Sequence, residues 1–298
     1  MAAMVECVPN FSEGRSRAAV DEIVAAICAQ AGVRLLDVSL DADHNRSVVT
    51  FVGPAEAVGA AAIAGAGAAA KVIDLRTHQG EHPRMGATDV IPFIPLGGTT
   101  MAECVSLSRH VAEELWARHR IPSYLYEESA ASPGRRNLAT LRKGQFEGLS
   151  EQVPRNPDLR PDVGEARVHP SAGITAVGAR HPLIAFNVNL ATTDLEVAKA
   201  IAREVRESTG GFPAVKAMGF ALAERGLVQV SMNMTRFEVT GLHTVFDAIA
   251  RKAQERNIAV VGSEIVGLVP MDALVDVAAA SLKLERFDRS QVLERRLL

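Results

Sequence analysis

The same order of expected elements occurs twice along this chain of 298 residues, and this repetition restricts the fold more than any other feature. Hydrophobic periodicity predicts strand, helix, strand, strand, helix and strand before a segment rich in proline and glycine, and the same order after it. The first set covers residues 4–9, 15–30, 33–40, 47–52, 54–72 and 90–96, and the second covers 183–190, 195–207, 215–222, 227–235, 242–256 and 258–266.

A further helix is expected after each set, at residues 100–118 and 271–284. The order βαββαβ is that of a ferredoxin-like plait, in which helices cover one face of a sheet. The sequence therefore predicts an α+β protein with two ferredoxin-like subdomains in tandem and a ligand cleft or tunnel between them.

The breaker-rich segment at residues 147–182 holds five of the fourteen prolines and four glycines. A long stretch of this kind inside a compact chain is either disordered or functional, and we interpret it as a linker. The length suits about two domains. We therefore assign residues 1–180, including the linker, to an N-terminal subdomain and residues 181–298 to a C-terminal subdomain.

Composition argues against several classes of partner. The net charge of -3 leaves no basic stripe for nucleic acid, and 4% aromatic content offers few stacking platforms. Neither a signal peptide nor a transmembrane run is evident, so we expect a cytoplasmic protein with no membrane partner. Cys7, Cys28 and Cys104 are odd in number and lie in apolar segments, as expected of small buried side chains in a reducing compartment.

One small-residue segment, residues 65–70 (GAGAAA), formally satisfies a dinucleotide-binding fingerprint. That fingerprint requires the glycines to follow a strand directly, whereas here they lie well inside a helix that begins near Pro54. We therefore expect a close helix-packing face.

Polar residues alternate with apolar ones on two strands of the second set. Asn187 and Asn189 alternate with apolar side chains on one strand, and Gln229, Ser231 and Asn233 do so on another. Because alternate residues of a strand face opposite sides of a sheet, these amides and the hydroxyl should share the face without helices. The face is either simply solvated or a polar floor for a flat heterocycle rich in donors and acceptors.

The most polar short segment is residues 78–86, HQGEHPRMG, which we call the polar loop. Its first five residues match the H-x-x-E-H zinc-peptidase pattern, but that pattern works on a helix, which Gly80 and Pro83 oppose. A second interpretation makes one histidine a general base, because imidazole titrates near neutral pH. A third is a solvated loop without a chemical role.

Asn45 and Arg46 lie in an acidic and amide-rich connection between two strands. Asn and Asp are favoured turn residues, so this connection either forms a turn or supports a ligand. We expect Asn45 and Arg46 to bind substrate.

Segments spread over nearly the whole chain resemble the glutamate formiminotransferase family. The matching segments are residues 5–14, 45–46, 50–53, 80–87, 92–95, 124–126, 178–180, 183–187, 242–245, 261–263 and 266–270. Their number, order and spacing make this resemblance more specific than any single motif.

The resemblance implies transfer of a formimino group from N-formimino-L-glutamate to N5 of tetrahydrofolate, a step of histidine degradation and one-carbon metabolism. Tetrahydrofolate would be a co-substrate and no metal would be needed. The family's catalytic base matches His82, and its folate-lining segment matches Gly164, Glu165, Ala166, Arg167, Val168, His169, Pro170, Ser171, Ala172 and Gly173. The expected substrate-binding residues are Glu81, Arg84, Asn45, Arg46, Asn187 and Asn189. Arg84 would either bind a substrate carboxylate or orient the loop, because a guanidinium grips a carboxylate in two places.

The family also includes fusions to a cyclodeaminase, which performs the next reaction. Residues 285–298 are too few for such a domain, so we expect a separate cyclodeaminase, small-molecule substrates and a homodimer. Two alternatives stay open: a glutamate formyltransferase acting with 5-formyltetrahydrofolate, and a non-catalytic folate-binding protein.

Overall fold

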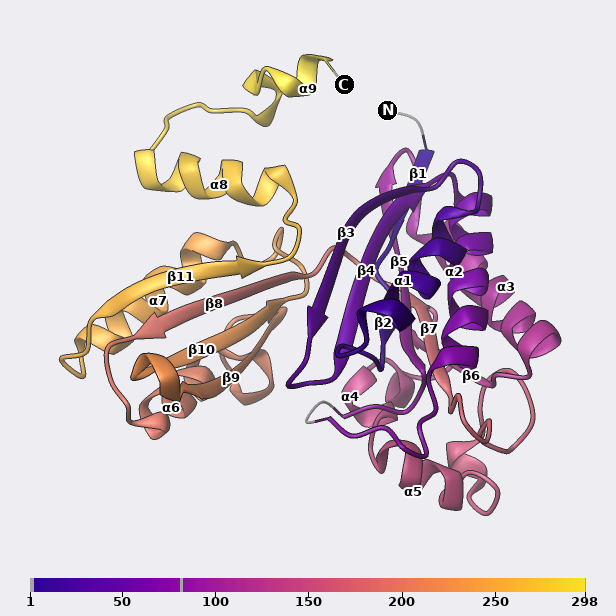
Figure 1. Cartoon of the computed structure of the whole chain (residues 1–298). Coiled ribbons are helices and arrows are strands. Elements are labelled where there is room, and N and C mark those ends of the chain that lie inside the picture. The colour runs from indigo at the N-terminus through magenta and orange to yellow at the C-terminus, as the bar shows by residue number, and fades with distance from the viewer. Residues whose placement is uncertain (1–2, 81–82, 298) are drawn as a thin grey trace. The chain divides into compact units, whose positions relative to one another are not determined.

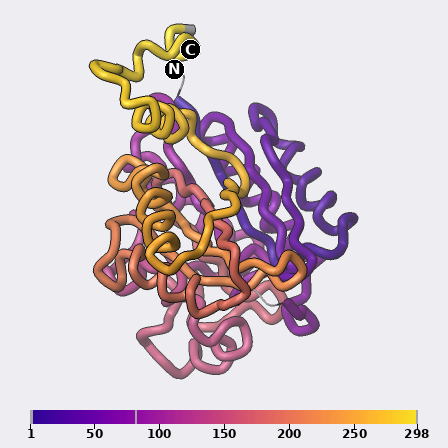
Figure 2. Tube along the Cα trace, turned by 90° about the vertical axis from the view of Figure 1, so that its left-hand side faces the viewer, coloured from indigo at the N-terminus to yellow at the C-terminus, as the bar shows by residue number. Residues whose placement is uncertain are grey.

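The computed structural model describes residues 3–80 and 83–297, and the chain divides into two compact units, Met1–Arg180 and His181–Leu298 (Figure 1). The first unit contains, in chain order, β1 (Ala3–Cys7), β2 (Asn10–Phe11), α1 (Arg17–Cys28), β3 (Arg34–Asp41), β4 (Arg46–Gly53), α2 (Ala55–Val72), β5 (Thr88–Gly97), α3 (Met101–His119), β6 (Ser123–Glu127), α4 (Leu138–Leu141), α5 (Gln145–Gln152) and β7 (Thr175–Ala179). The path of each unit can be followed by colour in Figure 2.

The first sheet contains a complete ferredoxin-like plait. The strands β1 and β2 both pair with β4 and β5, and β3 pairs with β4, all antiparallel. This gives the strand order of the plait, as the periodicity predicts.

Two further strands extend this sheet beyond β5. The strand β7 pairs in parallel with β5, and β6 pairs in parallel with β7. Residues 147–182 are therefore more than the linker that their prolines and glycines predict. Their apolar end, residues 174–179, is wholly buried and supplies an inner strand.

Both faces of this extension are covered. Side chains of one parity, such as Phe93 and Val177, belong to the main core with α1, α2 and α3. Side chains of the other parity, such as Val90 and Tyr124, form a smaller core with Leu149 of α5. The helices α1, α2 and α3 lie on one side of the sheet (Figure 1).

Small residues let α2 lie close to both neighbouring helices. A Cβ atom at Gly65 would be 2.8 Å from Cγ1 of Ile27 in α1, and one at Gly59 would be 2.8 Å from Cδ1 of Leu107 in α3. The expectation of a packing face is confirmed. Contrary to the expectation of no transmembrane run, the helix is also long and apolar enough to cross a membrane, but half of it is buried inside the protein.

Local signals fix where several helices begin. Thr100 and Glu103 form a reciprocal capping box at α3, and the Ser16 hydroxyl accepts the Ala19 N–H at α1. These side chains satisfy N–H groups that a helix leaves free in its first turn. Of the three cysteines, Cys7 and Cys104 are buried as predicted, whereas Cys28 is exposed at the last turn of α1.

The second unit repeats the plait. It contains β8 (Ile184–Leu190), α6 (Leu195–Val205), β9 (Val215–Leu222), β10 (Leu227–Met234), α7 (Leu242–Gln254), β11 (Val260–Val266), α8 (Met271–Leu282) and α9 (Glu294–Leu297). Its antiparallel strands lie in the order β11-β8-β10-β9. Val188 and Val230 face the core with Ile201 of α6 and Ile249 of α7. The predicted pair of ferredoxin-like subdomains is confirmed.

The close packing of α2 gives a stability prediction. Gly65→Ala should lower the free energy of unfolding, because the added methyl meets the buried Ile27 side chain and overpacking costs about 1–3 kcal/mol. Gly148→Ala in α5 is the matched control, because a Cβ atom there has no neighbour nearer than 3.5 Å. It should raise the free energy of unfolding by about 0.5–1 kcal/mol. Urea unfolding followed by circular dichroism measures both, and stabilisation by Gly65→Ala would contradict the packing argument.

Candidate functional site

The polar loop and the predicted folate segment are joined by backbone hydrogen bonds. The Ala87 N–H donates to the Ala172 carbonyl at 2.8 Å, and the Ile174 N–H donates to the Met85 carbonyl at 2.9 Å. Just before the loop, the Leu75 N–H donates to the Ser171 carbonyl at 2.9 Å. The two segments, about ninety residues apart in sequence, therefore form one surface of the first unit.

Two of the predicted site residues, Glu81 and His82, lie outside the described residues. The rest of the polar loop lacks regular structure, as Gly80 and Pro83 predict. Within residues 3–80 and 83–297, no three His, Cys, Asp or Glu side chains gather into a group that could hold a metal ion.

Arg84 is the centre of the loop's side-chain contacts, and its side chain is only 8% exposed. Its Nη1 and Nη2 donate to the two carboxylate oxygens of Glu147 at 2.8 and 2.6 Å, which makes a bidentate ion pair. Nη1 also donates to Gln145 Oε1 at 3.3 Å. Both partners, Gln145 and Glu147, lie in the first turn of α5. Sequence spacing gave no signal for either contact. This geometry favours the role of orienting the loop over binding a substrate carboxylate.

His78 is held in one tautomer by two partners. Arg84 Nε donates to Nδ1 of His78 at 3.1 Å, so Nδ1 is the acceptor and Nε2 carries the proton. Nε2 then donates to the Asn45 carbonyl at 3.1 Å. Burial lowers the pKa of His78, and the nearby Arg84 charge adds to that effect. With both ring nitrogens engaged, His78 has no lone pair for a zinc ion or a substrate proton.

Asn45 braces the loop from the β3–β4 connection. Its side-chain oxygen accepts the Gly14 N–H at 3.0 Å, and its Nδ2 donates to the Gln79 carbonyl at 2.9 Å. Asn45 adopts a left-handed φ of 47°, which asparagine tolerates better than most residues. A cavity of about 320 Å³ opens beside it, lined by Ser12, Glu13, Arg15, Asn45, Val72, Ile73, Asp74, Thr77, His78 and Gln79.

Asp89 fixes the other end of the loop. Its Oδ1 accepts the Met85 N–H at 2.8 Å, and its Oδ2 accepts a hydrogen bond from Arg142 Nη2. Arg46 lies in the same electrostatic environment, where burial lowers its pKa and the Arg142 charge lowers it further. Arg46 and Arg142 therefore lie near one another, with the carboxylates of Asp89 and Asp41 as neighbouring charges. Asp89 was not identified from the sequence.

The folate segment, residues 164–173, ends in a tight turn from His169 to Gly173. His169 and Gly173 exchange two backbone hydrogen bonds of 3.1 Å, and His169 Nδ1 accepts the Ala172 N–H at 2.9 Å. Gly173 has a φ of +74°, and a Cβ atom there would lie 2.1 Å from the Met85 carbonyl oxygen. Arg167 and Glu165 form an exposed ion pair of 2.9 Å. The close approach to Met85 explains the glycine.

A polar cluster lies on the helix-free face of the second sheet. Asn187, Asn189 and Gln229 are buried there, and Gln229 Nε2 donates to Asn189 Oδ1 at 2.9 Å. Glu264 of β11 joins them, because its Oε1 accepts from Asn187 Nδ2 and from Gln229 Nε2, each at 3.0 Å. Asn233 is exposed. Glu264 was missed in the sequence, and a strict period of two would not have found it. Val260 packs against the core, and the irregular register between Val260 and Gly262 moves Glu264 to the opposite face.

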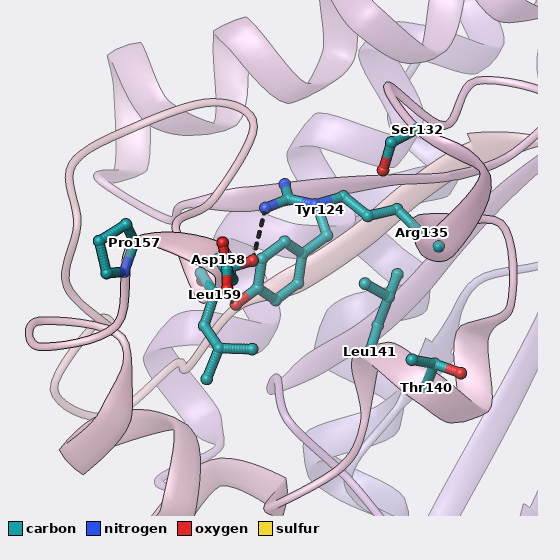
Figure 3. Close-up of a pocket in the computed structure, with 9 residues that line it drawn as sticks. Tyr124, Ser132, Arg135, Thr140, Leu141, Pro157, Asp158 and Leu159 are labelled. Carbon is teal, nitrogen blue, oxygen red and sulfur yellow. Dashed lines mark hydrogen bonds between the residues drawn. The ribbon is translucent and has the colours of Figure 1, made fainter.

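A larger cavity of about 460 Å³ lies elsewhere in the first unit (Figure 3). Arg135 stacks on the Tyr124 ring with 5.4 Å to the centroid, and its Nη1 pairs with Asp162 at 2.6 Å. Its Nη2 donates to the carbonyls of Asp158 and Arg160 at 3.1 and 2.8 Å. Because these contacts occupy the guanidinium, Arg135 holds the 157–162 turn in place and is not poised for a ligand.

Comparison with known proteins assigns both units to one family. Residues 4–180 match the family model described as "Formiminotransferase domain, N-terminal subdomain", and residues 185–296 match "Formiminotransferase domain". The chain is 49% identical to the glutamate formimidoyltransferase of Streptococcus pyogenes serotype M1, over 100% of both chains. It is 44% identical to that of Thermoplasma acidophilum, over 99% of this chain and 97% of the relative.

A fused relative covers the same region. The formimidoyltransferase-cyclodeaminase of Sus scrofa is 47% identical over 94% of this chain, which spans 52% of the relative.

The Arg84 contacts predict sensitivity to a charge-conserving change. Arg84→Lys keeps one positive charge but loses the bidentate pairing with Glu147 and the hydrogen bond to His78. We expect the free energy of unfolding to fall by about 1.5–3 kcal/mol, with faster amide hydrogen exchange at Phe146, whose N–H donates to the Arg84 carbonyl. Arg109→Lys, an exposed site on α3, is the control. Unchanged exchange at Phe146 would contradict the orienting role.

The environment of His78 predicts a pH effect. Because its pKa is lowered in the folded state, the unfolded chain binds the proton first as the pH falls through ~6.5. The stabilisation from neutral His78 is therefore complete above that pH and is lost as the pH falls toward the lower, folded-state pKa. Glutamine has an acceptor and a donor but does not titrate, so the free energy of unfolding of His78→Gln should fall less steeply than that of wild type as the pH drops below ~6.5. An identical slope in both proteins would contradict this assignment.

Proposed function

This chain belongs to the formiminotransferase family, and we propose that it is a glutamate formimidoyltransferase. It transfers the formimino group of N-formimino-L-glutamate to N5 of tetrahydrofolate. The observation that carries the proposal is 49% identity over the full length of a stand-alone enzyme of that name. Relatives with this name favour the formimino over the formyl donor, and an enzyme over a non-catalytic folate binder.

The reaction requires proton movement and close positioning of two substrates. N5 of tetrahydrofolate attacks the amidine carbon, and a new C–N5 bond forms as N5 loses its proton. The bond from that carbon to the glutamate nitrogen then breaks, and the glutamate nitrogen takes up a proton. A general base that accepts the first proton and returns one to the leaving nitrogen contributes about 10² to 10⁴ in rate.

We assign that base to His82. The assignment rests on the family resemblance and is supported by the contacts of its neighbour His78. The hydrogen bonds from Arg84 Nε and to the Asn45 carbonyl occupy both nitrogens of His78, so His78 is unsuited to the role. Glu81, next to His82, is our candidate for orienting that imidazole or binding substrate.

Both substrates carry several carboxylates, so the site needs cations. Arg46 and Arg142 supply them beside the polar loop, and Asn45 supports the same side of the loop. Arg84 acts by holding the loop against Glu147. Residues 164–173 contribute to the folate site, which is supported by their hydrogen bonds to the ends of the polar loop.

The pterin ring of tetrahydrofolate is assigned to the polar face of the second sheet. Pterins are flat and carry donors and acceptors around their edge, and Asn187, Asn189 and Gln229 present amides there. Tetrahydrofolate is a co-substrate in this scheme, and the chemistry calls for no metal.

We further propose that the enzyme is a cytoplasmic homodimer and that a separate cyclodeaminase consumes its product. The dimer is an expectation from the family. The separate enzyme is supported by the two stand-alone relatives, which match this chain over nearly their full length, in contrast to the fused one. Light scattering of the purified protein measures the oligomeric state.

The base assignment predicts a specific kinetic defect. His82→Ala should lower kcat by roughly 10² or more while folate affinity stays within a few-fold, because a base acts on the barrier more than on binding. Glutamate release from N-formimino-L-glutamate, with and without tetrahydrofolate, measures the activity. His110→Ala, exposed on α3, is the control and should keep wild-type turnover.

Two results would count against this scheme. Turnover of His82→Ala within threefold of wild type would remove the base assignment. A wild-type enzyme that uses N-formyl-L-glutamate but not N-formimino-L-glutamate would replace the proposed function with formyl transfer.

A further inference from the structure

Glu264 belongs to a hydrogen-bonded cluster whose geometry the sheet register dictates. In the second sheet Glu264 lies opposite Asn187, and Gln229 lies opposite Asn189. All four side chains therefore lie on the face that α6 and α7 leave open. One carboxylate oxygen, Glu264 Oε1, accepts two amide donors at 3.0 Å.

These contacts fix the orientation of both amides. Asn187 must present its NH₂ group to the carboxylate, because the opposite orientation would place two oxygens together. Gln229 Nε2 lies between two acceptors and is fixed in the same way. The hydrogen-bonding groups of the cluster that are still unused are therefore also defined.

Two acceptors remain unused at this cluster. The Asn187 residue is only 8% exposed, and its buried Oδ1 has no hydrogen-bond partner among the described residues. Glu264 Oε2 accepts no hydrogen bond within the described part of the chain, and the residue is exposed. Each of these oxygens is bonded to the same carbon atom as one end of the Asn187–Glu264 hydrogen bond. Leaving a buried acceptor unpaired costs about 1–3 kcal/mol, so an incoming donor has a free-energy advantage here.

We propose that Glu264, with Asn187 beside it, recognises a planar N–C–N group that carries two N–H donors. A carboxylate accepts such paired donors in parallel, as it does from a guanidinium. The inference rests on the proposed function, because both of its substrates contain this chemistry. The pterin ring presents N3–H and the 2-amino group, and the formimino group of the donor is an amidine.

Glu264→Gln tests this assignment with little change in shape. The amide oxygen can keep the contacts of Oε1 with Asn187 and Gln229, and the new NH₂ group then faces the N–H donors of the ligand. We expect at least a 10-fold rise in KM for one substrate, with kcat within threefold and an unchanged melting temperature. Glu264→Asp keeps a carboxylate and should recover part of the affinity. Glu224→Gln, an exposed carboxylate of the same unit, is the control.

Separate titrations identify which substrate Glu264 contacts. Calorimetry with 5-formyltetrahydrofolate and with N-formimino-L-glutamate gives each Kd without turnover. A weaker Kd for the folate alone assigns the pterin edge, and a weaker Kd for the donor alone assigns the amidine.

The outcome distinguishes this inference from the proposed function. An active wild-type enzyme with both KM and both Kd values of Glu264→Gln within twofold would overturn the role of Glu264 and leave the function intact. A wild-type protein that neither turns over the substrates nor binds either ligand would overturn both.

Discussion

Alternation of side chains across each sheet is the constraint on which this protein depends most. In the second sheet, Val188 and Val230 contact the helices, while Asn187, Asn189 and Gln229 lie on the opposite face. Because successive residues of a strand point to opposite faces, a shift of one residue would exchange the core with the polar face. The same pairing that buries the core therefore also assembles the amides with Glu264.

The polar loop of the first unit depends on a different kind of interaction. Backbone hydrogen bonds hold its end to residues 172–174, and side chains from distant elements hold the rest of its described residues. Arg84 pairs with Glu147, and Asp89 accepts the Met85 N–H at one end of the loop. Near the other end, Asn45 accepts the Gly14 N–H and donates to the Gln79 carbonyl. A surface held by charged and amide side chains responds to pH and to single substitutions more than a backbone ladder would.

Features that depend on local periodicity were predicted correctly, whereas features that depend on contacts between distant residues were not. Both βαββαβ sets and the small-residue face of α2 follow from local periodicity, and they form as predicted. The strand β7 was not predicted, because it has only five apolar or small residues and lies in a segment rich in proline and glycine, which predicts a loop. Cys28 lies in an apolar run, but its place at the last turn of α1 exposes it.

Local sequence patterns specify which residues share a strand or helix face, because backbone geometry sets the periods of 2 and 3.6 residues. They also place the polar loop and the amides among the candidate site residues. The partners of these residues are set by long-range pairing in the folded chain. The Arg84–Glu147 pair spans 63 residues and the Asn187–Glu264 hydrogen bond spans 77. Such pairs depend on strand order and register, which no local spacing encodes.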